Sequence, residues 1–106
     1  MRSSSVIIFL TALVTPFVAA KLHSNAICID ILSGVSVYNE AATIASCGNY
    51  RVRNTGNKQW DQCPDCEMKV IGNLNVCHSD GWHIGGDEIN YYCEKINNAG
   101  GSLANS

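Results

Sequence analysis

The chain has 106 residues, of which six are cysteines and 46% are hydrophobic, and its formal net charge is −2. This length allows one domain, and a chain without a basic excess is a poor candidate for binding nucleic acid or anionic membranes. A domain of this size is only marginally stable without covalent cross-links. The six cysteines therefore indicate a disulfide-stapled domain that folds in an oxidising compartment.

The first twenty residues have the features of a secretory signal peptide. Arg2 gives a short positive start, residues 6–14 form an apolar run, and residues 18–20 fit the preference of signal peptidase. The run is too short for a membrane-spanning helix, which needs about 20 apolar residues. We therefore expect cleavage after Ala20, secretion without a membrane anchor, and a mature chain that has six basic and nine acidic residues.

The first half of the mature chain predicts a strand, a helix and a second strand. Residues 26–32 partly alternate apolar and other side chains, which is typical of a strand. Asn39 is a good N-cap and Gly48 a good C-terminal stop for a short helix over residues 40–47. Residues 49–53 alternate apolar side chains with arginines and predict a half-exposed strand.

The second half predicts a hairpin, a longer helix and a tail. Residues 67–71 and 74–78 form the two arms of the hairpin around a Gly-Asn turn. A helix is expected over residues 87–99, with an aspartate as its cap, an apolar stripe at three- and four-residue spacing, and Gly100 as its stop. Residues 101–106 are small and polar and predict a disordered tail.

These elements predict an α+β fold. Two helices and about four short antiparallel strands would form a small two-layer sandwich within a single domain of residues 21–100. Disulfides are expected to staple its two layers. All six cysteines should take part: Cys28, Cys47, Cys63, Cys66, Cys77 and Cys93.

The sequence CPDC, residues 63–66, allows three interpretations. A thioredoxin-like redox centre needs its first cysteine at a helix N-terminus, whereas a hairpin is predicted after this motif. A zinc site would combine Cys63, Cys66 and Cys77 with His78 or His83, but it lacks the usual second pair of closely spaced ligands. We therefore expect three structural disulfides, no free thiol, no metal and no cofactor.

The pairing of the cysteines is open, because six cysteines allow fifteen connectivities. Cys47 and Cys93 are expected on the inner faces of the helices, so bridges from helix to sheet would staple the layers. A bridge between Cys63 and Cys66 would close a tiny loop and remove little unfolded-state entropy, compared with about 3 kcal/mol for a 15-residue loop. We therefore predict that Cys63 and Cys66 bond to other partners. The cysteines on predicted strands are Cys28, Cys66 and Cys77.

The densest polar cluster contains His78, His83 and three carboxylates within eleven residues. A histidine with a carboxylate suits acid–base hydrolysis, and a small ribonuclease would be the natural enzyme of this size. Such an enzyme also needs cationic groups for the phosphate charge, and only the two arginines of residues 49–53 are available. We therefore assign no catalytic residue. The two histidines, with Trp60 and Trp82, are instead candidates for a binding surface, although both tryptophans also suit a half-buried core.

A signal peptide, a small acidic mature chain, six cysteines and no catalytic motif together resemble the small cysteine-rich secreted effectors of plant-associated fungi. The stretches YRVRNTGNKQWDQCPDC and CHSDGWHIGGDEINYYC resemble biotrophy-associated secreted proteins of that group. A weaker resemblance is to killer-toxin-like α/β folds. The resemblance covers residues 38–93 at most and transfers no functional residue. It implies action outside the fungus, on or in a plant host.

The expected function is therefore that of a monomeric, non-enzymatic secreted effector, which is either extracellular or delivered into host cells. Its partner would be a host protein or a cell-wall component. Two alternatives stay open: a small ribonuclease-like hydrolase that uses His78 or His83, and a killer-toxin-like antimicrobial protein. Activity that is lost in His78→Ala and His83→Ala with the fold intact would favour the enzyme, and lysis of competing microbes would favour the toxin.

Overall fold

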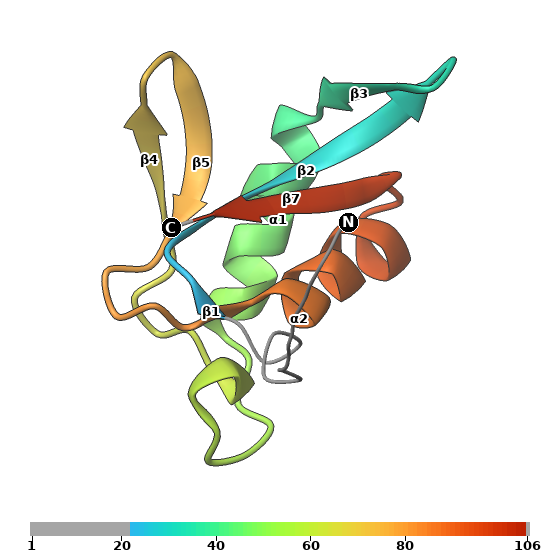
Figure 1. Ribbon diagram of the computed structural model, residues 1–106. Coiled ribbons are helices and arrows are strands. Elements are labelled where there is room, and N and C mark those ends of the chain that lie inside the picture. Colours follow the sequence, from blue (N-terminus) through green and yellow to red (C-terminus); the bar gives the residue numbers. More distant parts are fainter. Residues whose placement is uncertain (1–21, 106) are drawn as a thin grey trace, which may run out of the picture.

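The computed structural model describes residues 22–105. The predicted signal peptide and its cleavage site lie outside the described residues. A five-stranded antiparallel sheet forms the centre of the molecule (Figure 1). Its strands are β2 (Asn25–Leu32), β3 (Val35–Tyr38), β4 (Glu67–Ile71), β5 (Leu74–His78) and β7 (Gly101–Asn105).

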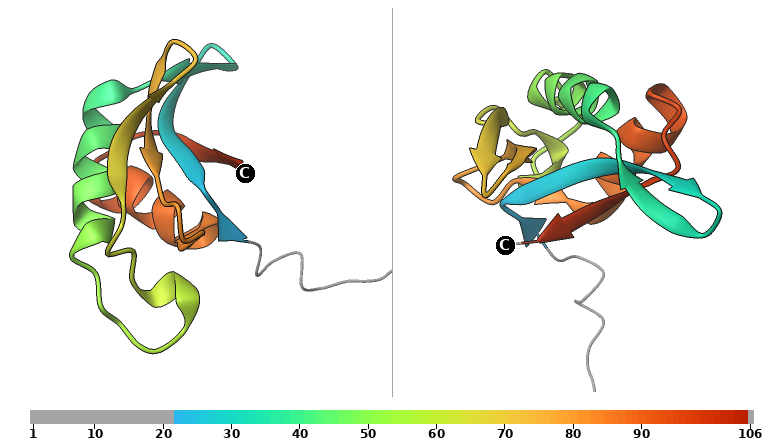
Figure 2. Two further views of the ribbon diagram at one scale, coloured as in Figure 1. Left: turned by 90° about the vertical axis from the view of Figure 1, so that its left-hand side faces the viewer. Right: turned by 90° about the horizontal axis from the view of Figure 1, so that it is seen from above.

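Two helices, α1 (Glu40–Arg51) and α2 (Gly86–Tyr91), lie on one side of this sheet (Figure 2). A short second sheet pairs β1 (Leu22–His23) with β6 (Ile84–Gly85). The prediction of a two-helix α+β fold with antiparallel strands is therefore confirmed, although the described part of the chain has seven strands instead of about four. No helix within residues 22–105 is long and apolar enough to cross a membrane.

Strand β2 organises the sheet, because three other strands pair with it. It pairs with β3 from Ile29↔Tyr38 to Leu32↔Val35, and with β7 from Asn25↔Asn105 to Ile29↔Gly101. It also meets β5 at Ala26↔Cys77, and β5 completes the predicted hairpin with β4. The alternation of β2 places Ala26 and Cys28 in the buried core, so the strand prediction for residues 26–32 is confirmed.

Helix α1 begins where the sequence indicates and ends later than expected. The Asn39 side chain accepts a hydrogen bond from the Ala42 amide at 2.9 Å, as an N-cap should. The helix then passes through Gly48 and ends at Arg51, so the strand predicted for residues 49–53 is wrong. The reason is Tyr50, which continues the buried helical face and has no exposed surface.

The second helix is shorter than predicted. Gly85 occupies the N-cap position, and Asp87 lies in the first turn instead of capping it. After Tyr91 the chain widens into a π-helical turn (Tyr92–Ile96), so the helical segment does not continue to residue 99. The backbone turns out of the helix at Asn98, which has a φ of 59°.

The predicted disordered tail is the largest correction to the fold. Residues 101–105 form β7 and pair with five residues of β2, so the folded domain extends beyond residue 100. The reason is that strand pairing satisfies backbone groups and does not require an apolar sequence. The composition of Gly101–Asn105 therefore does not indicate a strand, because this strand forms by pairing with β2, which is far away in the sequence.

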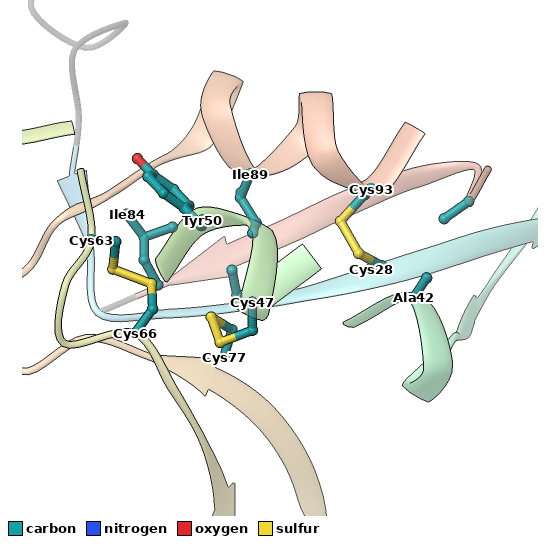
Figure 3. Close-up of a cluster of buried hydrophobic side chains, with 12 residues drawn as sticks. Cys28, Ala42, Cys47, Tyr50, Cys63, Cys66, Cys77, Ile84, Ile89 and Cys93 are labelled. Carbon is teal, nitrogen blue, oxygen red and sulfur yellow. A yellow bond between two sulfur atoms is a disulfide. The ribbon is translucent and has the colours of Figure 1, made fainter. Parts of the chain in front are cut away.

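All six cysteines are paired and buried in the core (Figure 3). Cys28 on β2 bonds to Cys93 in the π-helical turn, and Cys47 on α1 bonds to Cys77 on β5. The prediction that disulfides staple helices to the sheet is therefore confirmed.

The third disulfide joins Cys63 to Cys66, so the prediction that these two bond elsewhere is wrong. Loop-closure entropy depends only on the unfolded chain and not on the geometry of the folded one. In the folded chain a tight turn, in which the Cys66 amide donates to the Cys63 carbonyl, holds the two Cα atoms 5.3 Å apart, within the usual range for a disulfide.

Candidate functional site

The CPDC turn holds a neighbouring loop through Asp65. One oxygen of its carboxylate accepts from the Ser79 hydroxyl and the other from the Gly81 amide, both at 2.7 Å. Partial burial alone would raise the pKa of Asp65, but these hydrogen bonds and nearby His83 outweigh it, so the pKa lies below its usual value. The short disulfide therefore fixes a carboxylate that organises the loop from Ser79 to His83.

The sulfur atoms of Cys47, Cys66 and Cys77 lie within 4.8 Å of one another. The structure thus brings together two cysteines of the zinc set that the sequence allowed, Cys66 and Cys77. Each of the three is held in a disulfide, which leaves no thiolate for zinc or for redox chemistry in this oxidised form. The cluster is a junction at which two disulfides meet in the core.

The two histidines are engaged with neighbouring groups. The Nδ1 of His78 lies 2.7 Å from the Asn25 side-chain oxygen, and its Nε2 lies 2.7 Å from an Asp80 oxygen. The Nδ1 of His83 lies 2.9 Å from the Gln59 carbonyl oxygen. Both imidazoles therefore connect segments that are distant in the sequence.

The two tryptophans occupy different environments. Trp82 is 47% exposed and has a φ of 58°, and its carbonyl accepts a hydrogen bond from the Gln59 side chain at 2.9 Å. Trp60 lies in a 3-10 turn (Gln59–Asp61) and is half-buried. Of the two, Trp82 thus presents more of its side chain to a partner.

Tyr50 connects these loops to helix α2, which the sequence did not indicate. Its hydroxyl lies 2.7 Å from the Trp60 carbonyl oxygen and 3.1 Å from the His83 carbonyl oxygen, and it accepts a hydrogen bond from the Gly85 amide. Burial raises the pKa of Tyr50 to about 12, although the Gly85 amide opposes the shift. The hydroxyl therefore stays protonated and holds two segments together, the turn at Trp60 and the stretch from His83 to Gly85.

A cavity of about 420 Å³ lies between the segment that follows α1 and the exposed side of α2. The Arg53 guanidinium lies 5.8 Å from the ring centroids of both Tyr50 and Tyr92, within the range of cation–π contact. Its Nε donates to the Thr55 hydroxyl at 3.2 Å. The rings of Tyr91 and Tyr92 meet edge to face at 5.3 Å. The cavity is lined by Arg53, Thr55, Asp87, Glu88, Tyr91 and Tyr92.

Sequence reasoning missed this cavity as a site. The one sequence feature that could have indicated it is the stretch of residues 87–92, in which two carboxylates are followed by two tyrosines. The arginine lies just after α1, and only the packing of α1 against the second helical segment brings it to Tyr92.

A second, smaller cavity of about 180 Å³ lies where β2, β5 and β7 meet. Its lining is mainly apolar and includes Ile27, Leu74 and Leu103. It contains none of the histidines or tryptophans that the sequence singled out.

The family model described as biotrophy-associated secreted protein 4 matches residues 21–102. The chain belongs to this family. It is thus a small, cysteine-rich, secreted protein of the fungal effector type, and its location is extracellular. No curated protein and no solved structure shows significant similarity to the chain.

Proposed function

We propose that this protein is a non-enzymatic effector that binds a plant host molecule, either a host protein or a cell-wall component, during colonisation. Membership of a biotrophy-associated family supports a role during the colonisation of a living host. The observation that carries the binding role is the cavity beside Arg53, where cationic, acidic and aromatic side chains converge on a disulfide-stapled scaffold. The protein acts as a monomer, in which that cavity is open to a partner.

The surroundings of the histidines support binding over catalysis. A ribonuclease would need a cationic group beside its histidine to stabilise phosphate charge. Arg53 instead contacts tyrosines and Thr55, and both ring nitrogens of His78 face protein oxygen atoms. The imidazoles therefore act as loop connectors in this proposal.

A pull-down from host tissue tests the binding role. The oxidised protein is immobilised and exposed to apoplastic fluid and to cell-wall material, with reduced and alkylated protein as the control. We expect specific retention of one host protein or polysaccharide by the oxidised form only. Retention of nothing beyond the control, or hydrolysis of RNA that His78→Ala and His83→Ala both abolish without unfolding, would contradict the proposal.

The mature N-terminus is tested separately. We propose that secretion removes residues 1–20, in agreement with a family match that begins at residue 21. N-terminal sequencing of the secreted protein should read KLHSN. A fluorescent fusion should mark the space between fungus and host, and signal in the host cytoplasm would show delivery into host cells instead.

A further inference from the structure

We propose that the cavity beside Arg53 binds a neutral oligosaccharide. This inference rests on the proposed function and names the chemical class of the cell-wall component. It places the contact at the six residues that line the cavity, which belong to the segment just after α1, to α2 and to the first residue of the π-helical turn.

The charges of the cavity favour an uncharged ligand. One guanidinium and two carboxylates line the cavity, and within residues 22–105 neither Asp87 nor Glu88 forms an ion pair. The net negative charge disfavours phosphates and uronic acids, while Arg53 disfavours cations. A neutral polyol satisfies both kinds of group, because its hydroxyls donate to carboxylates and accept from the guanidinium.

The donors and rings are held in place before any ligand binds. Arg53 is fixed by Thr55 on one side and by the rings of Tyr50 and Tyr92 on the other. Tyr92 packs against both other tyrosines, at centroid distances of 5.7 Å to Tyr50 and 5.3 Å to Tyr91. Little side-chain entropy is therefore lost on binding. This small cost favours the binding of a sugar, whose weakly apolar surface contributes little free energy.

The aromatic lining suits the faces of sugar rings. A tyrosine ring has a negative face, and the C–H groups on one side of a pyranose carry a small positive charge. Tyr91 is 49% exposed at the rim of the cavity and is available for such stacking. The volume of about 420 Å³ falls within the ~300–1,000 Å³ of ligand pockets, and the open rim lets a polymer extend beyond it.

Glu88, which lines the cavity, also lies close to Trp60 across Gly85. A Cβ at Gly85 would clash with the Glu88 carboxylate and lie 3.0 Å from the Trp60 Cβ, so Glu88 and Trp60 flank the same glycine. Gly85 therefore lets the carboxylate lie against the backbone beside an aromatic side chain.

Calorimetric titration of the purified secreted protein, with its three disulfides intact, tests the site. The probes are soluble oligomers of β-linked glucose and of β-linked xylose, with an oligogalacturonate as the anionic comparison. We expect at least one neutral oligomer to bind and the oligogalacturonate to bind more weakly or not at all. Binding of no neutral oligomer, or a preference for the oligogalacturonate, overturns the proposal.

Variants locate the site. Asp87→Asn and Tyr91→Ala should each weaken binding about tenfold, the effect of losing one charge-assisted hydrogen bond or one stacked ring. Glu67→Gln, which removes an exposed carboxylate on β4, should leave the affinity unchanged. Both site residues are exposed, so circular dichroism should show folded variants. Affinity that survives both site variants overturns the assignment.

The two proposals fail in distinguishable ways. Retention of a host protein from tissue without any oligosaccharide binding overturns the sugar site and leaves the proposed function standing. Absence of both kinds of binding overturns both.

Discussion

At the residue scale, Asp65 explains why the CPDC turn matters to the rest of the molecule. Its carboxylate accepts from Ser79 and Gly81, on a loop that precedes Trp82 and His83. The Gln59 side chain supports the same loop from the other side by donating to the carbonyls of Gly81 and Trp82. The exposed Trp82 therefore lies on a loop that the side chains of Asp65 and Gln59 hold from two sides.

Replacing Asp65 should destabilise the protein in a pH-dependent way. Asp65→Ala removes two hydrogen bonds to a charged acceptor and should lower the free energy of unfolding by about 2 kcal/mol near neutral pH. Because the folded-state pKa of Asp65 is lowered, its contribution is present above the ordinary value of 3.8 and is lost as the pH falls through the folded-state value. Urea unfolding at pH 6 and pH 2.5 measures both effects.

Glu67→Ala is the control for this experiment, since it removes an exposed carboxylate from β4. This variant should change the free energy of unfolding by no more than about 0.5 kcal/mol at both pH values. A deficit of Asp65→Ala that is as large at pH 2.5 as at pH 6 would contradict the role of the charge.

Tyr50→Phe should lower the free energy of unfolding by about 1–3 kcal/mol, because it leaves the Gly85 amide and the Trp60 carbonyl without their buried partner. The folded-state pKa of about 12 adds a second signature. Stability from the protonated hydroxyl is complete below pH 10, where unfolded tyrosine starts to ionise, and declines as the pH rises toward 12. Unfolding of wild type and variant at pH 7 and pH 11 should therefore show a smaller difference at pH 11.

Tyr91→Phe provides the matched control, because its ring is half-exposed at the rim of the cavity. This variant should unfold like the wild type at pH 7. A loss equal to that of Tyr50→Phe would show that any tyrosine hydroxyl has the same effect.

At the element scale, the three disulfides contribute unequally. Cys28–Cys93 and Cys47–Cys77 span 65 and 30 positions and join helical segments to the sheet. Cys63–Cys66 spans 3 positions and shapes one turn. The long bridges therefore connect the layers, whereas the short bridge supports Asp65.

Removing the disulfides one at a time should reveal this order. In the loop-entropy model, loss of Cys63–Cys66 costs about 2 kcal/mol, while loss of either long bridge costs about 4 kcal/mol. Double serine variants of each pair, unfolded in urea, provide the comparison. Amide exchange in the Cys63/Cys66 variant should accelerate first at Gly81, which Asp65 holds. Equal destabilisation by all three double variants would refute the ranking.

Strand β7 provides a further test at this scale. Ending the chain at Gly100 removes the partner of β2 from Asn25 to Ile29 and should destabilise the protein by about 3 kcal/mol, the sum of several backbone hydrogen bonds. Leu103→Thr keeps the strand and changes a side chain that is 53% exposed, so it should alter stability by less than about 0.5 kcal/mol. Thermal unfolding of both proteins decides whether the segment is part of the domain.

At the scale of the whole molecule, cross-links compensate for a core of small side chains. The buried cluster contains all six cysteines and three alanines, and its largest members are Tyr50, Ile84 and Ile89 (Figure 3). Large apolar side chains such as Ile31, Leu32 and Val70 are exposed instead. Apolar burial alone is therefore modest, and the disulfides supply stability by restricting the unfolded chain.

The sequence by itself determined the features that depend on near neighbours in the chain. The Asn39 cap placed the start of α1, the turn at Gly72 placed the β4–β5 hairpin, and the cysteine content indicated a stapled α+β domain. Family membership was likewise legible from the residues as a resemblance. Each of these signals is carried by a few consecutive residues or by composition.

Only the tertiary structure decided the features that join distant segments. The strand at Gly101–Asn105 exists because β2 offers it a backbone partner, and α1 continues to Arg51 because Tyr50 is buried. The cavity beside Arg53 forms because two helices place an arginine, two carboxylates and three tyrosines together. Such contacts arise from packing between parts of the chain whose local sequences carry no information about each other, so local patterns could not predict them.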